Sequence, residues 1–233
     1  MPSSYIDIIL SLLAAVLAIT LHEAAHGYAA LALGDDTARR AGRLSLNPLV
    51  HVDRVGTILL PGLLLIAQLL TIHRVAFMFG WAKPVPVGAW RFANPRRGMM
   101  WVAMAGPGMN FLLAWLGGLA FHLLPVLPAV LGPAAQNFLI SFILFNLVLG
   151  LFNLIPIPPL DGGRIAVGLL PENAARVWAR TERYGILVVL LLVFLLPEAA
   201  REMGLAFDPV GAALDHLLPA ALRVVLILSG NHP

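Results

Sequence analysis

Residues 20–28 read TLHEAAHGY and lie inside an apolar run that extends over residues 6–33. On a helix, His22 and His26 are four positions apart and share one face. Two imidazoles in this arrangement can hold one zinc ion, and Glu23 beside the first can take a proton from metal-bound water. Ionisable residues are costly in hydrocarbon, so three of them within two turns predict a functional site rather than a chance pattern.

The composition indicates an integral membrane protein. The chain has 233 residues, of which 60% are hydrophobic and 12% charged, whereas soluble domains are about half apolar and a quarter charged. Cysteine is absent, which excludes disulfides and thiolate metal sites, so any metal must be held by histidine and carboxylate. The net charge is only +3, with the basic residues in short loops. This pattern is typical of membrane orientation and not of nucleic-acid binding.

Loop charge predicts the path of the chain through the membrane. The loops around residues 35–54 and 83–97 are both rich in arginine, so both are expected in the cytoplasm. The apolar run between them should then enter and leave on one side, as a re-entrant hairpin that turns near Pro61-Gly62. The alternative is a set of six plain spans with one loop that breaks the charge rule. The expected fold is therefore all-α and polytopic, with about five to six transmembrane helices, the N-terminus outside and the C-terminus inside.

A second candidate stretch, residues 152–164, reads FNLIPIPPLDGGR and contains three prolines before Asp161. A helix broken at membrane depth is tolerated where it lines a cavity. In the expected topology this helix runs in the same direction as the first, so Asp161 and the histidine pair lie in the same half of the membrane. Asp161 is therefore a candidate third metal ligand, although an interfacial aspartate in an Asp-Gly-Gly turn fits the pattern as well. Asn153 is either an oxyanion donor or an interhelical hydrogen-bonding residue.

Residues 105–109 read AGPGM and precede Asn110. Small residues let helices approach closely, and an asparagine beside them can link two helices by hydrogen bonds. Helix packing is the favoured interpretation of Asn110, with substrate binding as the alternative.

Residues 80–87 read GWAKPVPV and cannot form a helix, because their prolines are too closely spaced. In an extended segment, Pro84 and Pro86 remove donors from one edge, and the N–H groups of Val85 and Val87 point to the other. This short β-like segment is either a surface that binds an unfolded substrate by strand addition or a simple connector.

Three segments together resemble the site-2 protease family of intramembrane zinc metalloproteases, peptidase M50. They are HEAAH at residues 22–26, AGP at 105–107 and NLIPIPPLDG at 153–162. The resemblance covers residues 5 to about 170, and the combination of motifs is much more specific than any one alone. The sequence is similar to short bacterial members without a PDZ or CBS domain, although its apolar segment 55–73 is longer than in minimal members.

The resemblance implies a role for each candidate residue. His22, His26 and Asp161 would bind Zn²⁺, Glu23 would be the general base, and Asn153 would contact the substrate or the oxyanion. The segment that carries Val85 and Val87 is similar to the family's strand-like loop, which implies a substrate-binding role, and Asn110 follows the second motif.

The sequence thus predicts a zinc metalloendopeptidase that cuts transmembrane protein substrates within or near their spans. The expected partners are such a substrate and the lipid bilayer, with no nucleic acid. The expected location is a bacterial-type cell membrane, as a multi-pass protein with the active site in the cytoplasmic half. One protease domain is expected over residues 1–233, with a catalytic core at about 5–170 and C-terminal helices at about 180–230. The alternatives are a metal transporter, which needs polar residues along the whole path, and a catalytically silent binding protein of the same fold.

Overall fold

The computed structural model describes residues 5–71, 73 and 80–231, which form α-helices, short 3-10 and π turns, and loops. Five helical segments are long and apolar enough to cross a membrane, which confirms the predicted all-α, multi-pass fold. The α-helices are α1 (Tyr5–Ala32), α2 (Thr37–Arg40), α3 (Leu60–Thr71), α4 (Pro95–Ala120), α5 (Gly132–Asn153), α6 (Asp161–Leu169), α7 (Glu172–Arg180), α8 (Gly185–Leu190), α9 (Leu196–Glu202) and α10 (Pro209–Leu228).

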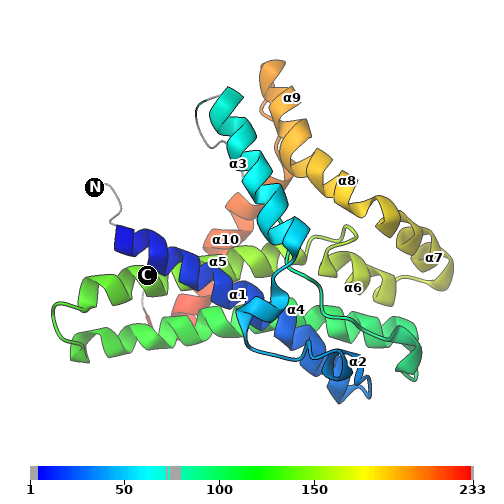
Figure 1. Cartoon of the computed structure of the whole chain (residues 1–233), viewed down its shortest axis with the longest axis horizontal. Coiled ribbons are helices and arrows are strands. Elements are labelled where there is room, and N and C mark those ends of the chain that lie inside the picture. Colours follow the sequence, from blue (N-terminus) through cyan, green and yellow to red (C-terminus); the bar gives the residue numbers. More distant parts are fainter. Residues whose placement is uncertain (1–4, 72, 74–79, 232–233) are drawn as a thin grey trace.

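Helices α1, α4 and α5 pack against one another, and α10 packs on α4 and α5 (Figure 1). A buried cluster joins α4, α5 and α10 through Ala114, Ile143, Leu147 and Val225. Small and branched apolar side chains dominate this contact, so the helices approach closely and exclude lipid. Helices α3, α8 and α9 extend away from the packed set as two arms (Figure 1).

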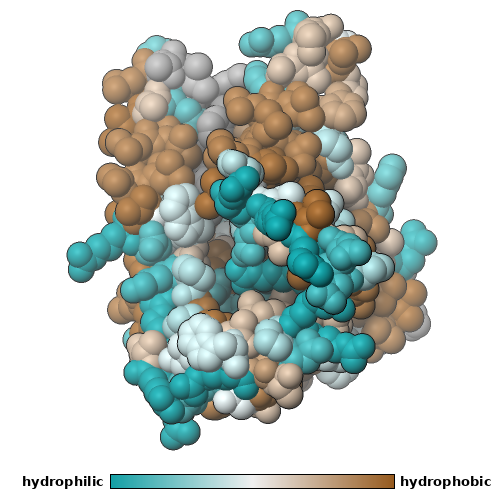
Figure 2. Space-filling model, turned by 90° about the vertical axis from the view of Figure 1, so that its right-hand side faces the viewer, coloured by the Kyte–Doolittle hydropathy of each residue, from teal (hydrophilic) through white to brown (hydrophobic). Residues whose placement is uncertain are grey.

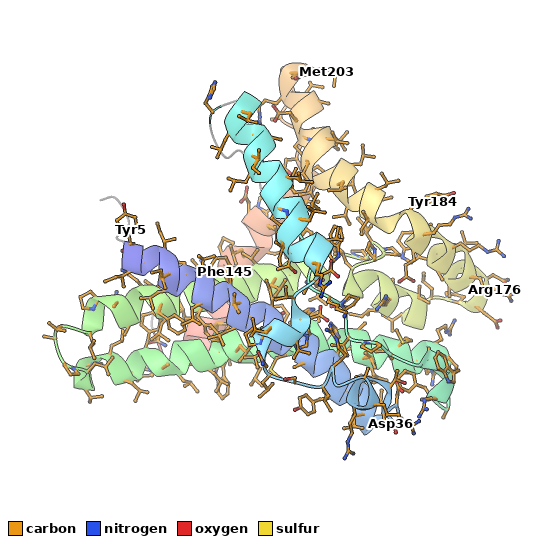
Figure 3. The ribbon with its side chains drawn as sticks, viewed as in Figure 1. Tyr5, Asp36, Phe145, Arg176, Tyr184 and Met203 are labelled. Atoms are coloured by element: carbon orange, nitrogen blue, oxygen red, sulfur yellow. The ribbon has the colours of Figure 1, made fainter. Side chains whose placement is uncertain are left out.

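Basic side chains gather at one end of the molecule, which we call the basic end and which carries α2, the start of α4 and α7. Asp36 and Arg176 lie at the basic end, and Tyr5 lies at the opposite or far end (Figure 3). In the space-filling view of the basic end, hydrophilic side chains cover the lower part and hydrophobic lobes stand above it (Figure 2). This separation is the one expected when basic loops face the cytoplasm.

The segment between the two Arg-rich loops leaves the basic end and returns to the same place. The N–H of Trp81 donates to the carbonyl of Gly56 at 3.1 Å, and the Thr57 hydroxyl donates to the carbonyl of Trp81 at 2.9 Å. Both ends of the segment lie at one point, as the predicted hairpin requires, and its path in the membrane stays a prediction. The predicted turn at Pro61-Gly62 is wrong, because both residues lie in α3, which continues directly from the π turn Arg54–Leu59. The described chain resumes at Gly80 beside Gly56 and Pro61, and residues 72 and 74–79 lie outside the described part.

Helix α10 runs opposite to the predicted direction. Val210, at its start, lines a small apolar cavity with Phe152 and Ile155 near the end of α5. At its other end the Leu228 carbonyl accepts a hydrogen bond from the Trp115 indole at 3.1 Å, on the last turns of α4. The start of α1 and the end of α10 therefore both lie at the far end (Figure 1). Loop charge alone could not place α10, because its position depends on packing and on these end contacts.

The loop over residues 80–88 is not helical, as its prolines require, and the predicted β-like segment is not paired as a strand with any described residue. Two buried charges hold it. Arg43 Nη2 donates to the Lys83 carbonyl at 2.7 Å, and the Gly88 N–H donates to Asp35 Oδ2 at 2.6 Å. Burial alone would raise the pKa of the Asp35 carboxyl, but hydrogen bonds from Thr37 and Gly88 lower it. An ionised carboxylate therefore anchors one end of the loop and a guanidinium anchors the other.

Candidate metal centre

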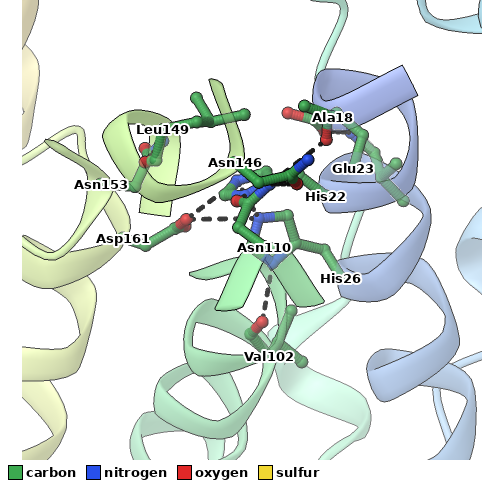
Figure 4. A network of polar contacts seen from close by, with 11 residues as sticks. Ala18, His22, Glu23, His26, Val102, Asn110, Asn146, Leu149, Asn153 and Asp161 are labelled. Atoms are coloured by element: carbon green, nitrogen blue, oxygen red, sulfur yellow. Dashed lines mark hydrogen bonds and ion pairs between the residues drawn. The ribbon is translucent and has the colours of Figure 1, made fainter. Parts of the chain in front are cut away.

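Three side chains from two distant helices converge on one buried point. The Nε2 atoms of His22 and His26 are 3.1 Å apart, and Asp161 Oδ2 lies 3.2 Å from the first and 3.4 Å from the second (Figure 4). The three residues were predicted as metal ligands from the sequence, and the structure brings them together. The position of Asp161 at this point favours the ligand interpretation over the interfacial turn.

Asp161 reaches the histidines because of the chain that precedes it. Helix α5 ends at Asn153, and residues 154–160 with their three prolines form a compact loop, so Asp161 becomes the first residue of α6. Gly162 lies so close to this loop that an added Cβ would be 2.3 Å from the Leu154 carbonyl oxygen. The Asp-Gly-Gly motif is therefore required for α6 to pack against the loop that directs its first side chain.

Helix α4 can approach the two imidazoles because of Gly106. A Cβ at Gly106 would lie 2.5 Å from ring atoms of His26 and 2.6 Å from His22 Cε1. No heavier side chain fits at that distance without moving a ring. This close approach explains the Ala-Gly-Pro motif in physical terms.

Hydrogen bonds fix the orientation of both rings. His26 Nδ1 bonds the Val102 carbonyl at 2.7 Å, and His22 Nδ1 bonds Asn110 Oδ1 at 2.6 Å. Asn110 Nδ2 in turn donates to Asn146 Oδ1 at 2.9 Å, which assigns Oδ1 of Asn110 as the acceptor. Each ring therefore carries its proton on Nδ1, and each Nε2 directs a lone pair toward Asp161.

The three convergent atoms fit a tetrahedral zinc ion. Ligands at the usual Zn–N and Zn–O distances are about 3.3 to 3.5 Å apart, close to the observed separations of 3.1 to 3.4 Å. Asp161 Oδ2 is buried and has no hydrogen-bond partner among the described residues. A carboxylate and two lone pairs at this spacing are a suitable ligand set for a cation.

Glu23 is half-buried next to His22 on α1 and is not part of the convergent set (Figure 4). Its Oε2 accepts a hydrogen bond from the Val85 N–H at 3.3 Å. The anchored loop over residues 80–88 thus holds the carboxylate in place. Val85 was predicted as a free donor for substrate, and in this conformation Glu23 occupies that donor. The Val87 N–H has no partner among the described residues.

The predicted substrate contact at Asn110 needs correction. Its side chain is fully buried and bonded to His22, Asn146 and the Ala18 carbonyl, so the residue positions a ring and does not face a substrate. Asn153 is half-buried near Asp161, but its Nδ2 donates to the Leu149 carbonyl on its own helix at 3.0 Å. It would have to rotate to reach an oxyanion, and that role stays a prediction.

Asn146 is a site residue that sequence reasoning missed. It is fully buried on α5, it receives the Asn110 amide, and its own Nδ2 donates to the Phe142 carbonyl at 2.8 Å. Its spacing of seven residues from Asn153 places both asparagines on one helix face. That pattern of polar residues in an apolar helix was a signal that could have identified it.

We expect Asn110→Leu to weaken zinc binding by about 10- to 100-fold, because outer hydrogen-bonding partners of metal ligands typically contribute that much. Competition with a zinc chelator measures the change. Asn137→Leu is the matched control, since Asn137 bonds Asp7 at the far end of the molecule. An unchanged zinc affinity in Asn110→Leu would show that the His22 ring is held without its help.

The model of peptidase family M50 matches residues 128–196, the part of the chain with Asn153 and Asp161. YwhC of Bacillus subtilis, provisionally named a zinc metalloprotease, is 40% identical over 184 residues, which are 76% of each chain. Rip2 of Mycolicibacterium smegmatis, with the same provisional description, is 32% identical over 82% of this chain and 70% of its own length. Rip2 of Mycobacterium tuberculosis H37Rv is 31% identical over 84% and 71%. No solved structure matches significantly. The chain belongs to peptidase family M50.

Proposed function

We propose that this protein is an intramembrane zinc metalloprotease that hydrolyses peptide bonds within or near the transmembrane segments of other proteins. Family membership and the names of the relatives support a zinc metalloprotease. The observation that carries the proposal is the convergence of His22, His26 and Asp161 within a set of membrane-length helices. The centre belongs in the cytoplasmic half of the cell membrane, because it lies toward the basic end.

The side chains at the centre divide the chemistry among them. His22, His26 and Asp161 would hold the ion through Nε2, Nε2 and a carboxylate oxygen. Bound zinc would supply Lewis acidity and a water molecule of lowered pKa. Glu23 takes a proton from the attacking water and returns it to the leaving amine. Asn153, once rotated away from Leu149, donates a hydrogen bond to the developing oxyanion.

The substrate must expose a peptide bond to this centre. A transmembrane helix hides its backbone in internal hydrogen bonds, so the segment has to unwind locally. The N–H groups of Val85 and Val87 can then bind the freed carbonyls by strand addition. For this to occur, the Val85 N–H must exchange its present partner, Glu23, for the substrate, which also releases the carboxylate for proton transfer.

The metal-transporter alternative finds no support in the polar residues of the described chain. Asp7–Asn137 and Ser11–Ser141 are polar contacts between α1 and α5 at the far end. Ala14 and Ala18 separate them from the metal centre on α1 and are buried, with 0% and 1% exposure. A permeating ion would meet closely packed side chains there, among them the fully buried Asn110 and Asn146, which lie beside the Ala18 carbonyl.

The test is cleavage by the purified protein in lipid vesicles that contain synthetic membrane-spanning peptides. We expect cuts inside the apolar stretch, found by mass spectrometry, that stop with 1,10-phenanthroline and return when Zn²⁺ is restored. Cleavage that survives removal of the metal, or that affects only water-soluble peptides, would refute the proposal.

A further inference from the structure

A cavity of about 480 Å³, in the size range of ligand sites, lies along α1 on the N-terminal side of the histidine pair. One wall is formed by α1, and the other by the π turn Arg54–Leu59 with the start of α3 and the loop at residues 80–82. Its lining is mostly apolar and includes Leu12, Val16, Ile19, Trp81 and Ala82. No role in the proposed mechanism uses this space.

Each wall of the cavity belongs to a segment that continues to Glu23 or to its hydrogen-bond partner Val85. Leu12, Val16, Ile19 and Glu23 are spaced by four, three and four residues, so they form one stripe on α1. The opposite wall ends at Ala82, three residues before the Val85 N–H that bonds Glu23. A substrate chain bound along the Val85 edge would therefore continue directly into the cavity.

The shape of the cavity depends on a close contact between Gly56 and Trp81. A Cβ on Gly56 would lie 2.4 Å from three atoms of the indole, so the ring rests on the glycine backbone. This contact places a large flat apolar surface in the wall that faces Val16 and Ile19. Such a surface suits an apolar side chain.

The cavity also contains a buried polar atom that lacks a partner. His51 is 3% exposed and lines the cavity. Its Nε2 donates to the Ser45 carbonyl at 2.8 Å, whereas Nδ1 has no hydrogen-bond partner among the described residues. In the neutral ring Nδ1 is an acceptor. Buried acceptors without a donor are costly, so a ligand that supplies an N–H would be stabilised here.

We infer that the cavity is a specificity subsite for one large apolar side chain of the unwound substrate, and that His51 Nδ1 accepts a backbone N–H beside it. The inference rests on the proposed protease function. Val16 and Glu23 are seven residues apart, about 10 Å along the helix. Since an extended chain advances about 3.3 Å per residue, the recognised side chain lies about three residues from the cut bond.

Photo-crosslinking tests the location without any need for catalysis. The probe is a membrane-spanning peptide of about 20 residues with benzoylphenylalanine at successive central positions, mixed with zinc-loaded Glu23→Gln protein in lipid vesicles. We expect one or two neighbouring probe positions to label Leu12, Val16 or Trp81. Adducts confined to other surfaces, or no adduct at all, would overturn the inference.

Cleavage by the active protein tests specificity. The same peptide is made with alanine, leucine or phenylalanine at the labelled position. Filling the cavity by Val16→Phe should lower the phenylalanine-to-alanine ratio of kcat/KM by about 10-fold or more. Leu13→Phe is the control, because Leu13 is exposed on α1 outside the cavity lining. An unchanged ratio in Val16→Phe would overturn the subsite, while absence of Glu23-dependent cleavage in the unsubstituted protein would instead refute the protease function.

A separate substitution tests the role of His51. In His51→Gln, the amide nitrogen can still donate to the Ser45 carbonyl, but the acceptor at the Nδ1 position is lost. We expect kcat/KM to fall by about 2- to 10-fold for all three peptides, as the loss of one hydrogen bond predicts, with zinc content unchanged. Undiminished cleavage would remove His51 from the subsite.

Discussion

Replacement of Glu23 by glutamine is expected to abolish peptide cleavage while the purified protein keeps its zinc. Glu23 lies outside the three-atom metal set, and its carboxylate is held by the Val85 N–H. Glutamine has nearly the same shape and can accept that hydrogen bond, but it cannot take a proton from water. Loss of a general base typically lowers a rate by about 10² to 10⁴. Cleavage of membrane-spanning peptides and metal content by mass spectrometry measure the two effects.

The matched control for this change is Glu202→Gln, which neutralises an exposed carboxylate at the end of α9. It should leave both cleavage and zinc content at the level of the unsubstituted protein. If Glu23→Gln retains more than about a tenth of the rate, another group moves the proton, and the assignment of Glu23 is wrong. If the variant loses its zinc, Glu23 is instead part of the metal centre.

The second large effect is expected for Asp161→Ala, which should leave the purified protein almost free of zinc. The change removes the carboxylate that lies 3.2 and 3.4 Å from the two imidazole Nε2 atoms. A catalytic zinc site uses three protein ligands, so the two histidines alone would leave the site without its third ligand. The zinc affinity should fall by much more than the 10- to 100-fold that is typical for loss of a hydrogen-bonding partner of a metal ligand. Zinc per protein, measured after dialysis against a weak chelator, reports the loss.

Asp215→Ala serves as the control, because Asp215 is an exposed carboxylate on α10. A second measurement separates zinc loss from misfolding. Added Zn²⁺ should raise the Tm of the unsubstituted protein, because a ligand that binds the folded state stabilises it, and should leave the Tm of Asp161→Ala unchanged. Equal zinc in both proteins would remove Asp161 from the centre.

The metal centre was largely predictable because local rules determine most of it. A helical spacing of four places His22 and His26 on one face, and the cost of charge in hydrocarbon indicates that they have a function. Asp161 is distant from the histidines in the sequence. Only the charges of the loops indicated that the helix before it runs in the same direction as α1. The structure places the three side chains together and adds Asn146, which the sequence analysis missed.

The hairpin and the last helix show where pattern reasoning was insufficient. Pro61-Gly62 is a sequence typical of turns, but both residues lie where the π turn Arg54–Leu59 passes into α3, an irregularity that often accompanies proline in a helix. The direction of α10 was predicted from alternation of spans. Its actual direction follows from the cavity that Val210 and Phe152 both line and from the hydrogen bond of Trp115 to the Leu228 carbonyl. Loop charge contains no information on such packing.

By itself, the sequence determined that this is an all-α membrane protein with a histidine pair and a neighbouring carboxylate on one helix. Composition and helical periodicity are properties of short segments, so they can be read without coordinates. Only the tertiary structure decided that Asn110 orients His22, that the loop at Val85 holds Glu23, and that a cavity continues from that contact. These features depend on how residues tens of positions apart pack together, and packing is a property of the whole fold.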